Sequence, residues 1–321
     1  MNTVGQQKYR IGVDIGGTGI KIGVIDGDFK VVKKTVVPTR AERGSAPIVE
    51  DIINACRSLT SEYDVIGAGI GSAGEINPSL GMVVGAGNLP FVNEPVAVKL
   101  SDALGMPVGI DNDGNCALIG ERAAGICKGL DDVILLTVGT GIGGAIMIGG
   151  KIYRGHNFRA GELGHFTIDI HGEQCECGLY GCYEHYASVR SLIRLTEKAA
   201  GENPQSTLAK LCADGADGKT AFTAASMGCP AAKAVLKEYS RLLSVGINSL
   251  VKIFQPEMIV LSGSIAREGQ TFLDYVNPHL VPEARVMTTA LAGDGGLIGA
   301  ALVGTDLTEQ NNLHTGGYEH F

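Results

Sequence analysis

Short apolar runs alternate with glycine turns in the N-terminal part of the chain. Two such runs, Tyr9 to Asp14 and Ile20 to Ile25, predict strands on either side of the turn IGGTG, and Val31 to Val37 predicts a third strand rich in β-branched residues. Between Ser45 and Ser61 the apolar residues recur near helical spacing instead. The pattern therefore predicts a glycine-linked sheet followed by a helix.

The rest of the chain continues this mixture of strands and helices. Short apolar runs predict strands at 65–70, 108–110, 133–138, 145–148 and 258–261. Longer periodic segments predict helices at 113–124, 188–200, 231–251, 271–277 and 296–304. The tail after Thr305 is polar and contains glycine, so we expect it to be loosely ordered. This alternation is typical of an α/β protein.

One pattern occurs twice. The sequence DIGGTGI begins at Asp14 and TVGTGIG begins at Thr137, and each reads as a strand, a Gly/Thr turn and a returning strand. The two copies begin 123 residues apart in the 321-residue chain. They predict two related domains, each of which presents a glycine hairpin to one ligand.

Composition and charge exclude several classes of protein. The chain carries 26 basic and 34 acidic residues, a net charge of −8, and no run of Lys or Arg, which argues against a nucleic-acid partner. The N-terminus is polar, so we expect no export signal. Glycines interrupt the longest uncharged stretch, Val133 to Gly150, so we expect a strand, a turn and a second strand in that stretch and not a membrane helix. We therefore expect a cytoplasmic protein with reduced or metal-bound cysteines.

The two glycine hairpins are candidate phosphate-binding sites. Glycine lets backbone N–H groups approach phosphate oxygens, and threonine adds a hydroxyl donor. Either hairpin alone could be an ordinary tight turn, but the pair, with Asp14 and Lys21 flanking the first, favours nucleotide binding. The stretch from Gly139 to Gly144 also satisfies G-x-G-x-x-G, yet the following AIMI predicts a strand where a dinucleotide site needs a helix.

The clearest local motif is His165 followed by Cys175, Cys177 and Cys182, all within 18 residues. Three thiols and an imidazole can surround one tetrahedral Zn²⁺, and four protein ligands without an open position indicate a structural site. Unrelated buried or disulfide-bonded cysteines are the alternative. His156 and His171 are competing donors that spacing does not exclude.

Two further groups of polar residues are candidates for substrate binding. The sequence DNDGN at 111–115 precedes a predicted helix, where Asp or Asn can cap the first turn or hold a carboxylate base. Glu162 and Glu184 flank the proposed zinc site, which would fix both carboxylates as acceptors for sugar hydroxyls. The alternative is that each is a solvated surface residue, as a lone Glu is by default.

Taken together, these motifs resemble the ROK family of repressors, open reading frames and sugar kinases. The resemblance covers nearly the whole chain, including DIGGTGIKIGV, Asn88-Leu-Pro, DNDGN, LTVGTGIGGAI, LSGS and GLIGAAL. Its most specific part is GELGH with C-x-C-G-x-x-G-C-x-E. The match is strongest to the bacterial ATP-dependent glucokinases.

The resemblance implies an actin-like ATPase (ribonuclease H-like) fold, with a small α/β lobe from 1–115 plus 298–321, a large zinc-bearing lobe from 116–297, and a cleft between them. It implies Asp113 as the base that deprotonates the 6-hydroxyl of a hexose, most simply glucose. The residues implied to hold the sugar are Asn88, Asn112, Asp113, Glu162, His165 and Glu184. Those implied to bind Mg-ATP are Asp14, Gly16, Gly17, Thr18, Lys21, Thr140, Gly141, Gly263 and Ser264. It further implies a homodimer or homotetramer.

Three alternatives remain at this point. An N-acetylmannosamine, fructose or other hexose kinase would share the same motifs, and ATP or polyphosphate could be the phosphoryl donor. A sugar-responsive repressor would need a helix-turn-helix module before the first hairpin, where only eight residues precede Tyr9. A zinc-bearing binding module without catalysis would leave the two phosphate hairpins unexplained.

Overall fold

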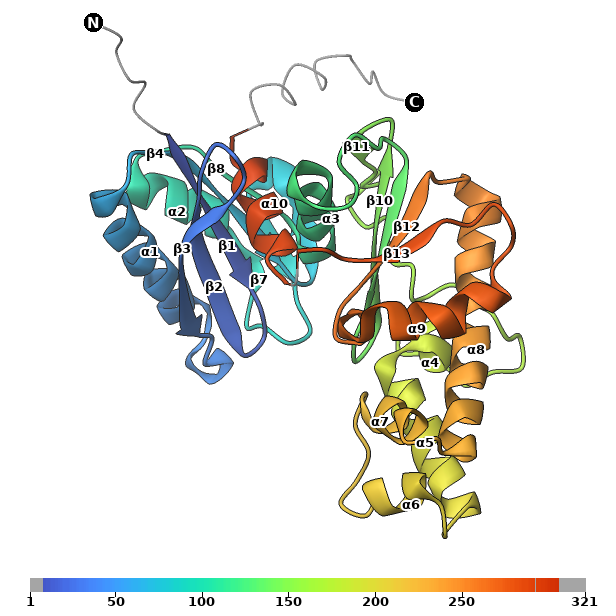
Figure 1. The fold of residues 1–321 in the computed structure, drawn as a ribbon. Coiled ribbons are helices and arrows are strands. Elements are labelled where there is room, and N and C mark those ends of the chain that lie inside the picture. The colour runs from blue at the N-terminus through green and yellow to red at the C-terminus, as the bar shows by residue number, and fades with distance from the viewer. Residues whose placement is uncertain (1–7, 292, 306–321) are drawn as a thin grey trace, which may run out of the picture. The chain divides into compact units, whose positions relative to one another are not determined.

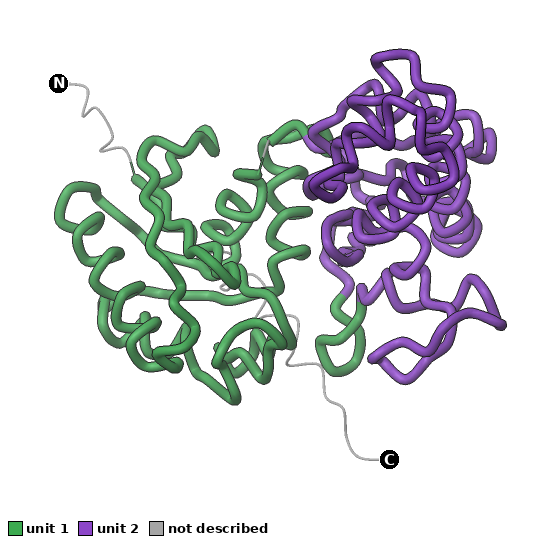
Figure 2. Tube along the Cα trace, turned by 90° about the horizontal axis from the view of Figure 1, so that it is seen from below, with its two compact units in different colours: residues 1–129, 154–160, 290–321 green, residues 130–153, 161–289 purple. Residues whose placement is uncertain are grey.

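The computed structural model describes residues 8–291 and 293–305, which fall into two compact units (Figure 2). Unit 1 comprises 1–129, 154–160 and 290–321, and unit 2 comprises 130–153 and 161–289. The boundaries expected from the sequence are 115/116 and 297/298 instead. The difference arises because the helix that begins at Asp113 packs closely on the C-terminal helix, so both stay whole within unit 1.

Unit 1 is built on a five-stranded sheet of order β3-β2-β1-β4-β8 (Figure 1). Its strands are β1 (Tyr9–Ile15), β2 (Gly19–Ile25), β3 (Val31–Pro38), β4 (Val65–Ser72) and β8 (Val108–Asn112). The first three form an antiparallel meander, whereas β4 and β8 join parallel to β1. The predicted glycine-linked sheet is therefore confirmed.

The two faces of this sheet differ in side-chain size. Ile11, Val13 and Ile15 of β1 pack into a buried cluster with α1 (Ser45–Glu62) and α2 (Val96–Leu104). On the other face, Cβ atoms at Gly12 and Gly69 would lie only 2.0 and 1.9 Å from carbonyl oxygens of α10 (Gly295–Val303). Glycine on this face therefore lets the α10 backbone lie directly on the strands.

Helix α3 (Asp113–Ala124) packs against α10. Smaller elements complete unit 1: η1 (Ala41–Arg43), η2 (Pro78–Leu80) and a three-stranded sheet of β5 (Glu75–Asn77), β6 (Met82–Gly85) and β7 (Val92–Glu94).

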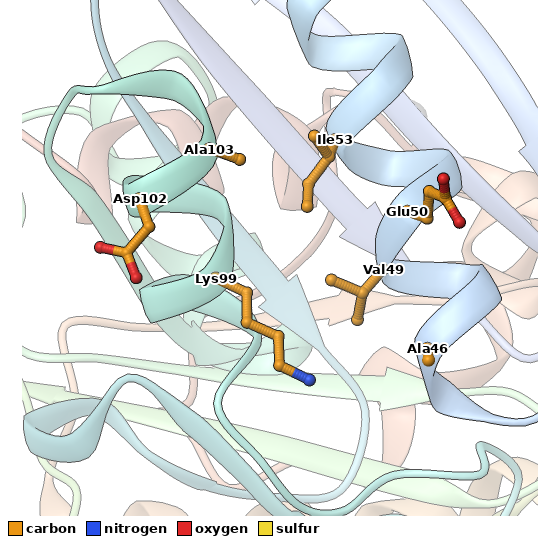
Figure 3. A pocket seen from close by; sticks show the side chains of 7 residues that line it. All are labelled: Ala46, Val49, Glu50, Ile53, Lys99, Asp102 and Ala103. Atoms are coloured by element: carbon orange, nitrogen blue, oxygen red, sulfur yellow. The ribbon is translucent and has the colours of Figure 1, made fainter.

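A shallow groove of about 470 Å³ lies between α1 and α2 (Figure 3). It is lined by Ala46, Val49, Glu50, Ile53, Lys99, Asp102 and Ala103. No residue that the sequence assigns to the sugar or the nucleotide lines it, so this groove is not the predicted site.

Unit 2 repeats the sheet of unit 1. Its strands run in the order β11-β10-β9-β12-β13, with an antiparallel β9–β10–β11 meander followed by two strands parallel to β9. They are β9 (Val133–Val138), β10 (Ile142–Ile148), β11 (Lys151–Ile152), β12 (Met258–Ser262) and β13 (Val286–Thr288). The same strand order in both units confirms the internal repeat seen in the sequence.

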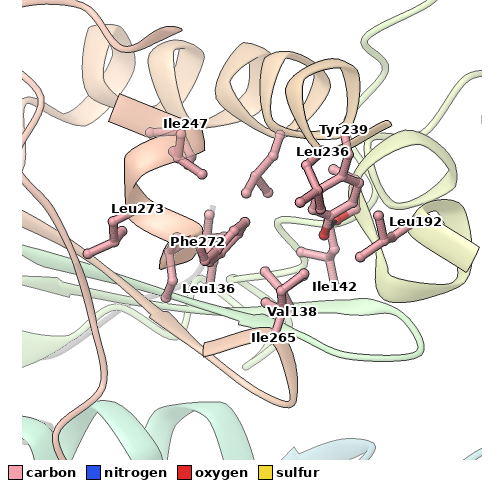
Figure 4. Close-up of a cluster of buried hydrophobic side chains, with 14 of the residues drawn as sticks. Leu136, Val138, Ile142, Leu192, Leu236, Tyr239, Ile247, Ile265, Phe272 and Leu273 are labelled. Carbon is pink, nitrogen blue, oxygen red and sulfur yellow. Dashed lines mark hydrogen bonds between the residues drawn. The ribbon is translucent and has the colours of Figure 1, made fainter. Parts of the chain in front are cut away.

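Helices cover this second sheet and bury the larger core (Figure 4). The helices are α4 (Glu184–Ala187), α5 (Val189–Glu202), α6 (Thr207–Leu211), α7 (Thr220–Ser226), α8 (Pro230–Phe254) and α9 (Gly269–Val276), with η3 (Ile265–Glu268) and η4 (Asn277–His279). Leu136 and Val138 of β9 meet Leu236 and Tyr239 of α8 in this cluster, with Phe272 of α9 beside them.

The strand predicted from Ala145 begins earlier in the structure. β10 starts at Ile142, three residues before the predicted Ala145, because Gly143 and Gly144 already pair with β9. A Cβ at Gly144 would lie 2.6 Å from the Leu163 side chain, so glycine there reflects packing and not a turn. The predicted tail after Thr305 lies outside the described residues. In the described part of the chain, no helix combines the length and the apolar character needed to cross a membrane.

Candidate active site

The turn between β8 and α3 holds the predicted catalytic base. The Oδ1 atom of Asn112 accepts hydrogen bonds from the N–H groups of Gly114 (2.8 Å) and Asn115 (3.4 Å), so Asn112 is the N-cap of α3. Asp113 is the first residue of the helix and is exposed; its Oδ1 accepts a bond from Gly114 N at 2.9 Å. The capping interpretation is therefore confirmed for Asn112. Asp113 presents a carboxylate at the positive end of the helix, and its role as a base stays a prediction.

Asp111, just before this turn, is buried and has four hydrogen-bond donors. Its Oδ1 accepts from Asn112 N and Asn115 Nδ2, both at 2.8 Å. Its Oδ2 accepts from Arg154 Nε at 2.9 Å and Nη2 at 2.5 Å. No sequence motif indicates Arg154, because no spacing rule connects positions 43 residues apart.

The first hairpin brings several predicted phosphate-site residues together. Antiparallel pairing sets Asp14 opposite Lys21, and Lys21 Nζ lies 2.8 Å from Asp14 Oδ2. The turn is held from behind by the buried Thr39, whose hydroxyl donates to Gly16 O at 2.6 Å and whose N–H donates to Thr18 O at 3.2 Å. Thr39 is a supporting residue that no sequence motif indicates.

Asn88, predicted to hold the sugar, lies beside this hairpin. A Cβ added at Gly17 would come within 2.9 Å of Asn88 Nδ2, so only glycine lets the two approach so closely. The structure thus places Asn88 beside Gly17 of the hairpin that also holds the Asp14–Lys21 pair, all within unit 1. The roles of these residues toward phosphate and sugar stay predictions.

The second hairpin, in unit 2, has a three-residue turn from Gly139 to Gly141, closed by a hydrogen bond of 2.9 Å from Gly139 N to Gly141 O. Glu184 lies against it: Glu184 Oε2 accepts from Ile142 N at 2.7 Å, and a Cβ at Gly141 would lie 2.2 Å from that oxygen. One of the two Glu184 carboxylate oxygens therefore supports the hairpin.

The turn after β12 is a neighbour of this hairpin. β12 runs parallel to β9, and Gly263 follows it with φ of +90°, a conformation that favours glycine. A Cβ at Gly263 would lie 2.3 Å from Val138 O, at the end of β9. Gly263 and the exposed Ser264 thus stand beside the turn that carries Thr140 and Gly141.

The cysteine–histidine cluster forms as the sequence predicts. The ligand atoms of His165, Cys175, Cys177 and Cys182 all lie within 4.8 Å of one another. The Cys175 Sγ–His165 Nδ1 and Cys177 Sγ–Cys182 Sγ distances are both 3.5 Å, close to the edges of about 3.5–3.8 Å that Zn–N and Zn–S bonds give a tetrahedron. The competing donors His156 and His171 are not part of this cluster.

The backbone around Cys177 favours the metal-binding form of that thiol. A backbone hydrogen bond from Leu179 lowers the pKa of the Cys177 thiol, and the thiolate is the form that binds a metal. His165 directs Nδ1 toward Cys175, which leaves Nε2 on the opposite side of the ring. The cluster is therefore compatible with a structural zinc whose histidine has a second nitrogen available.

The predicted site residues divide between the two units. Unit 1 contains Asp14, Gly16, Gly17, Thr18, Lys21, Asn88, Asn112 and Asp113, and unit 2 contains Thr140, Gly141, Glu162, His165, Glu184, Gly263, Ser264 and the three cysteines. Each unit thus contains one glycine hairpin and its own predicted polar residues.

Comparison with known proteins identifies the family. The model of the ROK family matches residues 10–306. The chain belongs to the ROK family. Among its relatives, the glucokinase of Streptomyces coelicolor is 36% identical over 305 residues, which cover 91% of this chain and 96% of the relative.

Solved structures of ROK proteins agree with this assignment. A ROK family glucokinase from Streptomyces griseus, crystallised with glucose and AMPPNP, matches with a TM-score of 0.78 and 35% identity over 92% of this chain and 99% of that one. A ROK hexokinase from Thermus thermophilus matches with a TM-score of 0.79 and 29% identity, covering 94% and 99%. The predicted family and its actin-like ATPase fold are thereby confirmed.

Proposed function

We propose that this ROK protein is an ATP-dependent hexose kinase that transfers the γ-phosphoryl group of ATP to the 6-hydroxyl of glucose. The observation that carries the proposal is the exposed Asp113 carboxylate at the start of α3, in a chain that matches glucokinases along nearly its whole length. The activity predicted from the sequence agrees with the names of these relatives.

Asp113 is the general base of the proposed reaction. Its carboxylate takes the proton of the sugar 6-hydroxyl as that oxygen attacks the γ-phosphorus, while the bond to the β–γ bridging oxygen breaks and ADP leaves. The N-terminal end of α3 favours the ionised carboxylate that this step needs. The N-cap Asn112 fixes the first turn of the helix and so fixes where the base lies.

The two hairpins hold the nucleotide in this proposal. Gly16, Gly17 and Thr18 offer backbone and hydroxyl donors in unit 1, and Thr140 and Gly141 do so in unit 2, with Gly263 and Ser264 bordering the adenosine. Lys21 would pair with phosphate oxygens, and Asp14 would approach Mg²⁺ through water. Magnesium, when bound with ATP, offsets the negative charge of the transferring group.

Asn88, Asn112, Glu162, His165 and Glu184 hold the sugar hydroxyls. Cys175, Cys177, Cys182 and His165 Nδ1 bind a structural zinc, which fixes the orientation of the His165 ring so that Nε2 can serve the sugar. The closeness of the four ligand atoms supports this zinc site. A homodimer or homotetramer stays a prediction.

The proposal is tested by measuring ADP release with Mg-ATP against glucose, mannose, fructose, allose, glucosamine and the two N-acetylhexosamines. We expect glucose to be the best substrate. Turnover of another sugar alone would keep the mechanism and change the substrate, whereas no turnover by folded, zinc-loaded protein would refute the kinase assignment.

The assignment of the base is tested by Asp113→Asn. We expect kcat to fall by about 10²–10⁴-fold, because general base catalysis is lost, while glucose binding measured by calorimetry persists. Asp28→Asn, which changes an aspartate that is 82% exposed in the turn after β2, is the matched control and should retain wild-type activity. Near-normal turnover by Asp113→Asn would show that another group is the base.

A further inference from the structure

Residues 154–160, which we name the strap, belong to unit 1, although residues 130–153 before them and 161–289 after them belong to unit 2. The strap closes on itself, since Ala160 N donates a hydrogen bond of 3.1 Å to Arg154 O. Glu162 follows the strap by two residues in the chain. The strap is therefore a covalent extension of the segment that carries proposed sugar-binding residues.

Two arginines of the strap form ion pairs within unit 1, and the pairs differ greatly in burial. Arg154 pairs with Asp111, whose side chains are 19% and 2% exposed. Arg159 pairs with Glu75, whose side chains are 57% and 45% exposed. An exposed pair contributes little, whereas a buried carboxylate that loses its partner becomes an uncompensated charge.

The Arg154–Asp111 contact is also directional. Two nitrogens of the guanidinium, Nε and Nη2, reach the same carboxylate oxygen, which fixes the position and orientation of the Asp111 carboxylate. The other oxygen of Asp111 then accepts from Asn112 N and Asn115 Nδ2. The chain of contacts thus runs from Arg154 through Asp111 to the residues on both sides of Asp113.

We infer that Arg154 is a positioning residue for phosphoryl transfer. Through Asp111 it fixes the turn that presents Asp113, and through the strap it joins that turn to the segment that contains Glu162. The inference rests on the proposed function, because it assigns Asp113 and Glu162 their roles. In this role Arg154 acts through Asp111 and does not touch the reacting atoms.

A purely structural ion pair predicts a different outcome. Its loss would lower the thermal stability of the protein but leave the kinetics of the folded molecules unchanged. A positioning residue instead changes kcat, because small displacements of a catalytic group reduce the rate steeply. The two roles are therefore separated by kinetics measured well below the unfolding temperature.

The test compares Arg154→Met, Arg154→Lys and Arg159→Met with the wild-type protein in glucose phosphorylation. For Arg154→Met we expect kcat to fall on the order of ten- to a hundredfold, while KM for ATP stays within about twofold. Arg154→Lys keeps the charge but cannot donate to Asp111 Oδ2 through two nitrogens of a rigid planar group, so it should recover only part of the rate. Arg159→Met, which breaks the exposed pair of the same strap, should retain the wild-type kcat.

Wild-type kcat in Arg154→Met or, should that variant not fold, in Arg154→Lys would overturn the inference. An equal loss in Arg159→Met would also overturn it, since the effect would then belong to the strap as a whole. A wild-type protein that phosphorylates no hexose refutes the proposed function and removes the basis of the inference. An active wild type with insensitive Arg154 variants refutes the inference alone.

Discussion

Replacing Gly299 by alanine should force apart the helices α3 and α10 of unit 1. The added Cβ would lie 1.7 Å from the carbonyl oxygen of Cys116 in α3 and 2.9 Å from Gly120 N. Real Cβ atoms essentially never approach a neighbour within 3.0 Å. Because the obstacles are backbone atoms, no side chain can rotate away, and one helix must move by more than about 1 Å.

The opposite side of α10 leaves no room for that movement. The carbonyl oxygens of Leu297 and Ala300 already occupy the space where Cβ atoms of Gly12 and Gly69 would lie. Overpacking of a core costs about 1–3 kcal/mol, and the rigid surroundings put this site at the upper end. Alanine recovers about 1 kcal/mol of helix propensity, so the net loss should be about 2 kcal/mol. At about 2–4 °C per kcal/mol for a chain segment of this size, Tm should fall by roughly 4–8 °C.

Gly201→Ala is the matched control. Gly201 lies in α5, is exposed, and has no atom within 4 Å of an added Cβ, so only helix propensity changes. We expect a small gain in its free energy of unfolding, about 0.5 kcal/mol at this position near the helix end. Urea and thermal unfolding followed by far-ultraviolet circular dichroism measure both variants. A loss below about 0.5 kcal/mol in Gly299→Ala would refute the packing argument.

Two further predictions concern unit 2. Purified protein should contain one zinc per chain by mass spectrometry. Cys177→Ser or a strong chelator should remove the zinc and lower Tm, because the ligand cluster then loses its central ion. Metal-free protein with an unchanged Tm would contradict the zinc assignment. Tyr183→Phe should lower the free energy of unfolding in urea by about 1 kcal/mol, since the buried hydroxyl donates to Leu243 O at 2.5 Å. The control is Tyr180→Phe, which alters a tyrosine that is 53% exposed. Equal stabilities of the two variants would count against a contribution from that hydrogen bond.

Local patterns predicted the parts of the fold that have strong local causes. Strand β1 alternates buried Ile11, Val13 and Ile15 with residues on its other face, and α3 begins and ends at the predicted residues. The strands β5–β7 were not predicted, because they are short and lie in a Gly- and Pro-containing stretch. Helices α2, α6 and α7 were missed as well. The last two have five and seven residues, and their apolar side chains pack into the core of unit 2.

In the candidate site, too, some residues belong to local sequence patterns and others act from distant positions in the chain. Its glycine hairpins, the capped start of α3 and the four clustered metal ligands are contained in short stretches of sequence, so spacing and chemistry reveal them. Thr39 and Arg154 support those stretches from distant positions, through a turn carbonyl and a buried carboxylate. Such contacts depend on tertiary structure alone, and a single sequence gives no pattern that would identify them.

The division of unit 1 into separate chain segments also affects biosynthesis. Helix α10 is the last described element to leave the ribosome, yet it covers the glycine face of the first sheet, which is made at the beginning. Domains generally fold as units during synthesis. The glycine face of the first sheet therefore stays uncovered until unit 2 has been translated. A nascent chain that stalls before residue 295 exposes Ile25 and the glycine face to chaperones and to other nascent chains.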